Sequence, residues 1–457
     1  MPKDYFYSIP VMTMLVNDKT REATLAELKR AKAGRVFLCV GTMRDETLPM
    51  YIESLKENIP FFRGAGYEVG VWVNSCGHGG ALVNDDPDSM TTDEYTLIRD
   101  VDGRVQPGNY CVADPDFIAD MARRTAEIAK TGPDLIMLDD DLRLDVRAIG
   151  VCCACDRHMD ILKRLTGREF TREELKKELA DPMPNPTRDA FLKANRDSMV
   201  GFAAKLREAV NEAAPGVRLG YCAAPLSFDQ EGYSAEELTY SFAGDTKPFL
   251  RLSAAPYWAS REVKRLPETI EKSRQQAAWL RHEGHKDIEL FAEGDCYPRP
   301  RLNCPASYLE CFDQAILADP NIDGILKYMV DYAMSIRYEH GYIDRHVKDS
   351  ALREAIAREF RSRKSVGVYN FVTHRITAGQ HRPYDGDAIS WRENASTRFL
   401  LAQSLPITYE FTRTAIDTSP VLVSVFGEDA RFIGADVLFS SSVFSHYFRC
   451  SRLCSVC

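Results

Sequence analysis

The segment LIMLDDDLRL, residues 135–144, runs four apolar residues directly into three consecutive aspartates. A short, uniformly apolar run is typical of a parallel strand that is buried on both faces of its sheet. Three adjacent carboxylates at the end of such a strand repel one another and resist losing water. The segment therefore predicts a buried strand that carries functional carboxylates at its end. A structural alternative is that one aspartate caps the next turn and another pairs with Arg143.

Similar apolar runs recur along the first three quarters of the chain and alternate with helical patterns. We expect strands over 35–41, 67–75, 134–138, 217–223, 251–257, 288–295 and 324–330, with CVAD (111–114) as a short third strand. Helices are expected over 48–66, 114–132, 188–214, 266–283 and 306–319. Eight parallel strands with helices between them predict a closed (β/α)8 TIM barrel. An open doubly wound sheet is the alternative, but no GxGxxG or GxxxxGK[ST] motif follows any of these strands.

The α/β pattern restarts after the predicted barrel. A charged helix is expected over 351–364, and further apolar segments follow it. We therefore expect two domains, a barrel over 1–345 and a smaller, incomplete Rossmann- or flavodoxin-like unit over 346–457. The C-terminal tail has no periodicity and contains Cys-x3-Cys-x2-Cys, a spacing that can bind metal. We favour a truncated or misread terminus over a metal site there.

The composition describes a soluble globular protein. Of its 457 residues, 45% are hydrophobic and 27% charged, and the formal net charge is −9. An acidic chain is a poor partner for nucleic acid or for an anionic membrane, so a small neutral substrate fits better. The N-terminus lacks the features of a signal peptide, and no window is apolar enough to span a membrane. We expect a cytoplasmic protein whose 13 cysteines are reduced thiols or metal ligands.

Candidate catalytic residues follow the predicted strands, because chemistry in a (β/α)8 barrel takes place at the carboxyl ends of its strands. Asp139, Asp140 and Asp141 follow the fourth strand, and Glu293 lies at the end of the seventh, nearly opposite them. Two carboxylates across a pocket suit glycoside hydrolysis, in which one protonates the leaving oxygen and the other attacks the anomeric carbon. We expect substrate contacts from polar and aromatic residues at these strand ends: Arg44, Asn74, His78, Asp139, Arg143, Tyr257, Trp258, Tyr297, Lys327 and Tyr328.

Structural alternatives exist for several of these residues. Glu293 could be a core glutamate paired with a barrel lysine such as Lys327. His78 lies in the glycine-flanked segment SCGHGGAL, where it could simply form a turn. Tyr257 and Trp258 could pack in the core or at the rim instead of binding a sugar.

A second group of residues has metal-ligand spacing. Cys153, Cys155 and His158 form Cys-x-Cys-x2-His, and Cys111 could supply a fourth ligand from another strand end. Four protein ligands of this type would hold a structural Zn²⁺ with no open coordination position. The alternative is that these are ordinary core cysteines.

These motifs together resemble the clan A glycoside hydrolases, most closely the family 42 β-galactosidases and the related family 164 β-mannosidases. Family 42 enzymes carry Asp-Asn-Glu at the end of strand 4, then Cys-x-Cys-Asp-x-Cys, with another cysteine upstream. This chain has Asp139-Asp140-Asp141, then the segment CACDRH (153–158), with Cys111 upstream. The resemblance implies a (β/α)8 catalytic barrel without a catalytic cofactor and a Rossmann-like second domain used in forming a homotrimer.

The resemblance also implies roles for single residues. Asp141 takes the position of the acid/base, Asp140 that of a substrate-holding asparagine, and Glu293 that of the nucleophile. The structural zinc positions fall on Cys111, Cys153, Cys155 and His158. Aspartate is shorter than the family's glutamate, so Asp140 remains an alternative acid, and histidine here replaces the family's last cysteine.

Three functional hypotheses follow. The leading one is a retaining exo-β-glycosidase, β-galactosidase- or β-mannosidase-like, that acts on a small oligosaccharide or glycoside by double displacement. A second is a non-catalytic carbohydrate-binding or scaffold barrel, since fold does not determine function. A third is a divalent-metal sugar isomerase or aldolase in which the three aspartates hold Mg²⁺ or Mn²⁺.

Overall fold

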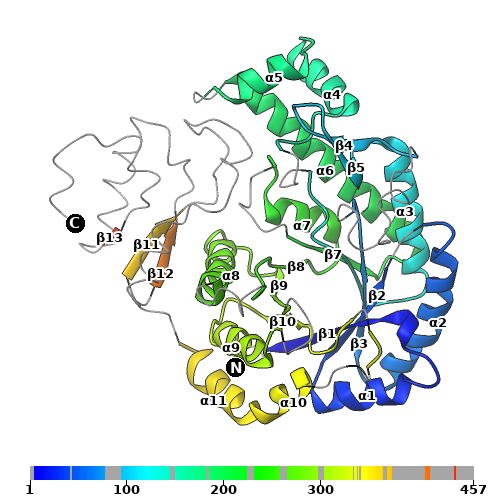
Figure 1. Cartoon of the computed structure of the whole chain (residues 1–457), viewed down its shortest axis with the longest axis vertical. Helices are drawn as coiled ribbons and strands as arrows, with labels where there is room; N and C mark the ends of the chain where they lie inside the picture. The colour runs from blue at the N-terminus through cyan, green and yellow to red at the C-terminus, as the bar shows by residue number, and fades with distance from the viewer. Residues whose placement is uncertain are drawn as a thin grey trace.

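The structure, a computed structural model, is a closed barrel of eight parallel strands with an outer layer of helices (Figure 1). It describes residues 5–41, 44–77, 94–144, 150–181, 185–223, 231–257, 265–296, 303–332, 334–336, 338 and 341–363, together with three short strands beyond them. The barrel strands are β1 (Phe6–Met12), β2 (Arg35–Val40), β3 (Glu68–Val73), β6 (Leu135–Leu138), β7 (Arg218–Cys222), β8 (Phe249–Arg251), β9 (Glu289–Gly294) and β10 (Gly324–Lys327). Strand β1 closes the ring by pairing with both β2 and β10. The predicted (β/α)8 barrel is confirmed.

Two of the strand predictions are wrong. The segment 111–114 is not a barrel strand, because it follows an antiparallel hairpin formed by β4 (Leu97–Arg99) and β5 (Val105–Tyr110). Strand β1 was not predicted, because Ser8 and Pro10 interrupt its apolar run. The two errors compensate in the numbering, so that β6 is still the fourth strand of the barrel and β9 the seventh.

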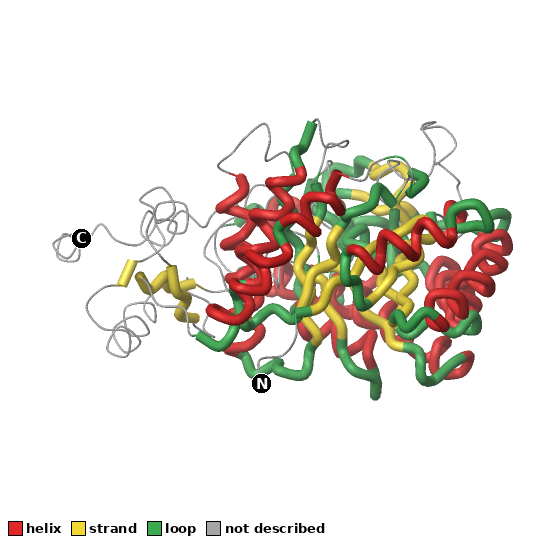
Figure 2. Tube along the Cα trace, turned by 90° about the horizontal axis from the view of Figure 1, so that it is seen from below, coloured by secondary structure: helices red, strands yellow, loops and turns green. Residues whose placement is uncertain are grey.

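Helices surround the strands on all sides, as the red and yellow tubes of Figure 2 show. They are α1 (Arg21–Arg30), α2 (Leu48–Gly64), α3 (Pro115–Ala129), α4 (Asp156–Thr166), α5 (Arg172–Leu179), α6 (Pro186–Ala213), α7 (Ala235–Ala243), α8 (Arg265–His282), α9 (Ala306–Leu317), α10 (Gly341–Lys348) and α11 (Ser350–Phe360), with a short 3-10 helix over Thr13–Leu15. Capping residues determine where several of these helices begin. Asp114 caps α3 by accepting from two backbone N–H groups, and Thr171 forms a capping box with Glu174 at α5. In the described residues, no helix is long and apolar enough to cross a membrane.

A buried ion-pair cluster fills the amino-terminal end of the barrel. The Arg35 guanidinium lies 2.8 Å from a Glu289 carboxylate oxygen and 2.7 Å from Glu68. It also lies over four phenylalanine rings, those of Phe6, Phe37, Phe249 and Phe291. Because one end is occupied in this way, the polar side chains available for chemistry are those at the carboxyl ends of the strands.

Three short parallel strands lie outside the barrel (Figure 1). They are β11 (Val368–Val372), β12 (Ile407–Phe411) and β13 (Val437–Leu438), with β11 in the middle. The helix expected to open the second domain is α11, and it packs on the barrel. Arg353 donates to Glu310 of α9 at 2.8 Å, and Arg361 just after α11 donates to the Leu317 carbonyl at 3.1 Å. The cysteine-rich tail lies outside the described residues.

Candidate active site

Glu293 lies buried at the carboxyl end of β9, with only 2% of its surface exposed. Its Oε1 accepts a hydrogen bond from the Tyr257 hydroxyl at 2.7 Å and forms an ion pair with the Arg251 guanidinium. Its Oε2 accepts from the backbone N–H of Ala254 at 3.3 Å. All three donors belong to β8 or the segment that follows it, so one stretch of chain fixes the carboxylate of the neighbouring strand.

The charges around Glu293 act in opposite directions on its ionisation. Burial raises the pKa of the Glu293 carboxyl, Arg251 and Tyr257 lower it, and Asp140 and Asp295 raise it further. The net result is a raised pKa. Burial and the nearby Glu293 also raise the pKa of Tyr257, so this phenol stays protonated and donates its hydrogen bond.

The three aspartates after β6 have three different environments. Asp139 is buried and accepts from the Arg251 guanidinium at 3.1 Å. Asp141 is fully buried and accepts from the Ser75 N–H at 2.8 and 3.0 Å, from the Ser75 hydroxyl at 2.7 Å and from the Gly77 N–H at 2.6 Å. Asp140 is half-buried, and its charge acts on Glu293.

This geometry gives Asp141 a structural role and favours Asp140, the alternative that the sequence left open, as the candidate acid. The Asp141 carboxylate ties the end of β6 to the loop after β3 through donors that it must keep, and it has no solvent-exposed surface. A general acid has to reach the glycosidic oxygen of a substrate. Asp140 is partly exposed, and repulsion from its carboxylate raises the pKa of Glu293.

Lys327 is a second correction, because it points away from the barrel mouth. The residues on either side of it, Leu326 and Tyr328, belong to the cluster inside the barrel. The Lys327 ammonium therefore lies on the helix side, where it donates to Glu310, to Asp313 at 2.7 Å and to His346 at 2.8 Å. It is completely buried, so the predicted substrate contact is wrong. The suggested pairing of Glu293 with Lys327 is wrong as well, since Arg251 is its partner.

The other predicted contacts are distributed around the mouth. Asn74 follows β3 and donates to the Gly41 carbonyl at 2.9 Å, and Arg44 lies in the turn before α2. Arg143 is half-buried in the turn after β6. Tyr328 follows β10. His78, Trp258 and Tyr297 lie outside the described residues.

Three inward-facing residues at this end of the barrel were missed. Arg251, Trp72 and Tyr332 had no separate signal because each belongs to or follows a run of apolar residues. An arginine within such a run is unusual, since charged side chains are seldom fully buried without a partner. Trp72 packs edge-on against Tyr328 and Tyr332, with ring centroids 5.8 and 5.1 Å apart, and forms an aromatic wall near Glu293.

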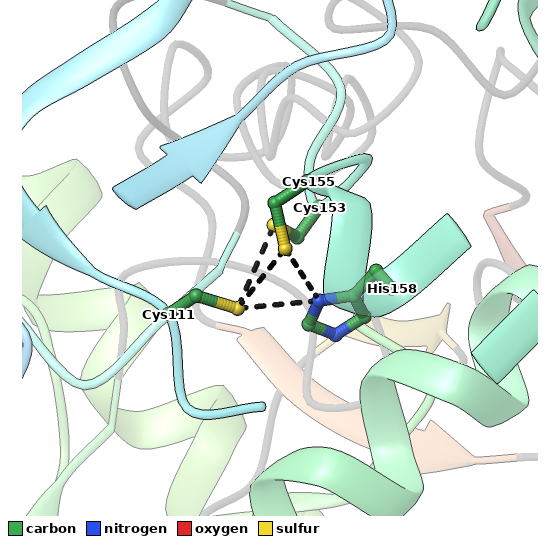
Figure 3. A group of neighbouring side chains, drawn as sticks. All are labelled: Cys111, Cys153, Cys155 and His158. Atoms are coloured by element: carbon green, nitrogen blue, oxygen red, sulfur yellow. Dashed lines mark hydrogen bonds between the residues drawn. The ribbon is translucent and has the colours of Figure 1, made fainter. Parts of the chain in front are cut away.

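The four predicted metal ligands come together in one buried cluster (Figure 3). The Cys111 Sγ lies 3.8 Å from the Cys153 Sγ, 3.5 Å from the Cys155 Sγ and 3.2 Å from the His158 Nδ1. Ligand atoms about 2.3 Å from a tetrahedral Zn²⁺ would lie about 3.8 Å apart. The spacing and the soft donor set therefore fit a four-coordinate structural zinc.

Different segments of chain build this cluster. Cys111 follows the β4–β5 hairpin, while Cys153, Cys155 and His158 lie at the start of α4. The Asn195 side chain accepts from the Cys153 N–H at 3.4 Å and donates to the Cys152 carbonyl at 3.1 Å. The Ala113 N–H donates to the Cys111 sulfur at 3.5 Å. These contacts orient the ligands, as second-shell groups do in metal sites.

A second group of potential ligands, Glu310, Asp313 and His346, has a different character. The Lys327 ammonium donates to all three, so a cation already occupies the space between them. This cluster stabilises the packing of α9 and α10 on β10.

The fold is that of the family 42 β-galactosidases. A β-galactosidase from the Antarctic haloarchaeon Halorubrum lacusprofundi superposes with a TM-score of 0.60 at 13% identity, over 95% of this chain and 72% of that one. A β-galactosidase from Rahnella sp. R3 gives 0.57 at 12% identity, over 90% and 65%. A structure described as a GH42 β-galactosidase gives 0.51 at 11% identity, over 89% and 65%. This chain thus spans about two thirds of the length of these enzymes. No protein-family model and no curated protein sequence matches it.

Proposed function

We propose that this chain is a retaining exo-β-glycosidase with Glu293 as nucleophile and Asp140 as acid/base. The observation that carries the proposal is a buried carboxylate held by Tyr257 and the Ala254 N–H, with a second, half-buried carboxylate acting on its pKa. Two carboxyl groups in unequal environments at the mouth of a (β/α)8 barrel support a reaction in which one acts as acid/base and the other as nucleophile. The likeness to β-galactosidases supports the same reaction class.

In the first step, Glu293 would attack the anomeric carbon while Asp140 gives its proton to the leaving oxygen. In the second step, Asp140 would take a proton from the water that hydrolyses the glycosyl ester. Esterification removes the negative charge of Glu293, so Asp140 no longer faces a second carboxylate when it acts as a base. The fixed Tyr257 hydroxyl provides a donor that needs no reorganisation as charge develops.

The substrate we propose is a terminal β-galactoside or β-mannoside of a small oligosaccharide or glycoside. Trp72 and Tyr328 offer apolar surface beside the carboxylates, and Asn74 lies on the same rim. Rings and hydrogen-bonding groups at one barrel mouth suit a sugar, which has an apolar face and polar edges.

We also propose that Cys111, Cys153, Cys155 and His158 hold a structural Zn²⁺. The ion would join the β4–β5 hairpin to the start of α4. The same hairpin is tied to the loop after β3, because the Tyr110 N–H donates to the Cys76 carbonyl at 2.9 Å. Asp141 also accepts hydrogen bonds from that loop. The zinc site would therefore help to fix the position of the segment after β6, which carries Asp140.

The test is hydrolysis of 4-nitrophenyl β-galactoside, β-mannoside, β-glucoside and α-galactoside by the wild type and by Glu293→Gln, Asp140→Asn and Asp141→Asn. Glu208→Gln, a change on the exposed face of α6, serves as the control. We expect turnover of one β-glycoside that is lost in Glu293→Gln, falls about 10²–10⁴-fold in Asp140→Asn and is unchanged in the control. Absence of turnover on every substrate from folded protein would contradict the proposal and favour a binding or scaffold barrel.

A further inference from the structure

Arg251 is the inward-facing last residue of β8, and its guanidinium lies between two carboxylates from different strands. One terminal nitrogen donates to Asp139 at the end of β6 at 3.1 Å, and the other forms an ion pair with Oε1 of Glu293 on β9. The side chains of Arg251, Asp139 and Glu293 are exposed by only 1%, 5% and 3%. These three residues form a buried network of charged groups directly beneath the proposed reaction centre.

The contacts of the two Glu293 oxygens are unequal. Oε1 is held by both Arg251 and the Tyr257 hydroxyl, whereas within the described residues Oε2 has one longer hydrogen bond, from the Ala254 N–H at 3.3 Å. An oxygen that is held by a guanidinium and a phenol has little freedom to form a bond to carbon. Oε2 is therefore the oxygen that can turn to the anomeric carbon.

We propose that Arg251, anchored by Asp139, is a positioning residue that keeps Glu293 ionised and leaves Oε2 as the attacking oxygen. This inference rests on the proposed function, because it explains how the same nucleophile, Glu293, is ionised and oriented. Asp139 acts through Arg251 and is not a substrate ligand, which revises its predicted role.

Several groups act on the charge of Glu293, some favouring the ionised form and others opposing it. They come from every element packed against the carboxylate: Arg251 and Tyr257 from β8 and its continuation, Asp140 after β6, Asp295 after β9, Tyr328 after β10 and Lys272 of α8. Burial, Asp140 and Asp295 raise the pKa of Glu293, and Arg251 lowers it. Lys272 cannot replace the arginine, because burial lowers its pKa to about 7 and an arginine side chain keeps its charge at any working pH.

Three substitutions distinguish an electrostatic role of Arg251 from a role in packing alone. Arg251→Met removes the cation at similar length and is expected to raise the pKa of Glu293 by at least about one unit. Asp139→Asn removes a negative charge and leaves the Arg251 guanidinium with Glu293 as its one remaining carboxylate partner of the two, so the pKa of Glu293 should fall. Arg251→Lys keeps a charge that reaches one carboxylate less well, and an intermediate value is expected.

The first readout is the acid limb of kcat/KM against pH, which reports the ionisation of the free enzyme. Opposite shifts in Arg251→Met and Asp139→Asn are expected, together with partial rescue in Arg251→Lys. A purely structural role would lower kcat/KM in both variants without moving the acid limb, and this result would overturn the proposal. If Arg251→Met fails to fold, the Arg251→Lys and Asp139→Asn pair still gives the two opposite shifts.

The second readout does not need turnover. The difference in urea unfolding between each variant and the same variant with Glu293→Gln, followed against pH, gives the pKa of Glu293 in the folded protein. Because this pKa is raised, the stabilising effect of the protonated group is lost as pH rises through it. An unchanged pKa in Arg251→Met would refute the role of Arg251. If Arg251→Met raises the pKa of Glu293 but the wild-type protein hydrolyses no glycoside, the electrostatic role of Arg251 would be supported and the proposed function refuted.

Discussion

Replacing Asp141 and Asp140 by asparagine should give opposite phenotypes, although the two residues are adjacent. The buried Asp141 carboxylate accepts from the Ser75 N–H, the Ser75 hydroxyl and the Gly77 N–H. Hydrogen bonds to a charged group contribute about 1.5–3 kcal/mol each, and asparagine would turn an NH2 group toward one or two of these donors. We expect Asp141→Asn to lose about 3–5 kcal/mol of stability. Asp140 is half-buried, so Asp140→Asn should change stability by less than about 1 kcal/mol.

For turnover, we expect Asp140→Asn to be the more damaging of the two substitutions. Asp140→Asn removes the proton donor, and we expect kcat on the best 4-nitrophenyl glycoside to fall about 10²–10⁴-fold. Asp141→Asn should keep a measurable rate at temperatures where it is folded. Thermal unfolding by circular dichroism and initial rates on the same preparations provide the two measurements. A stable Asp141→Asn protein that is inactive, beside an active Asp140→Asn, would refute our assignment of the acid.

Four further results are expected. Cys155→Ala should lower the zinc content from one ion per chain, measured by atomic emission, and lower the unfolding temperature, whereas alanine at the exposed Cys311 should do neither. Lys327→Met should cost about 3–5 kcal/mol of stability in thermal unfolding, because it removes the cation that lies 2.7 Å from the buried Asp313 carboxylate, and KM should not change. Tyr257→Phe should lower kcat more than it raises KM, since it removes a donor to the nucleophile. Burial alone would raise the pKa of Glu289, but its arginine partners lower it to about 2, so about 3 kcal/mol of stability should be lost in urea unfolding as pH falls from 4.5 toward 2, and Glu289→Gln should lack this dependence.

The barrel was predictable because fully buried parallel strands leave continuous apolar runs in the sequence. Strands β2, β3, β6 and β9 each appear as such a run. Strand β1 lacked this signal, because Ser8 and Pro10 interrupt it although both are buried. The segment 111–114, which follows the β4–β5 hairpin, took its place in the count, since a short apolar segment gives no information on its partner.

The site was predictable in its residue types but not in its pairings. The metal ligands lie at a spacing with a chemical meaning, which explains why four residues from two segments could be named together. Side chains alternate between the two faces of a strand, so the face on which Lys327 lies depends on where β10 begins. The sequence does not mark that position, and the direction of Lys327 could not be predicted. The bond between Asp141 and Ser75 spans 66 residues and depends on the shape of two loops, which no periodicity encodes. Arg251 was missed because its two partners come from two other strands, β9 beside it and β6 beyond β7.

The central claim is that Glu293 forms a covalent bond with the sugar. It can be tested most directly by incubating the protein with 2,4-dinitrophenyl 2-deoxy-2-fluoro-β-glycosides of the galacto and manno series and mapping the labelled peptide by mass spectrometry. We predict one fluoroglycosyl group per chain on Glu293 in the wild type, and none in Glu293→Gln. A label on another carboxylate, or release of product with inverted configuration from unlabelled enzyme, would contradict the account.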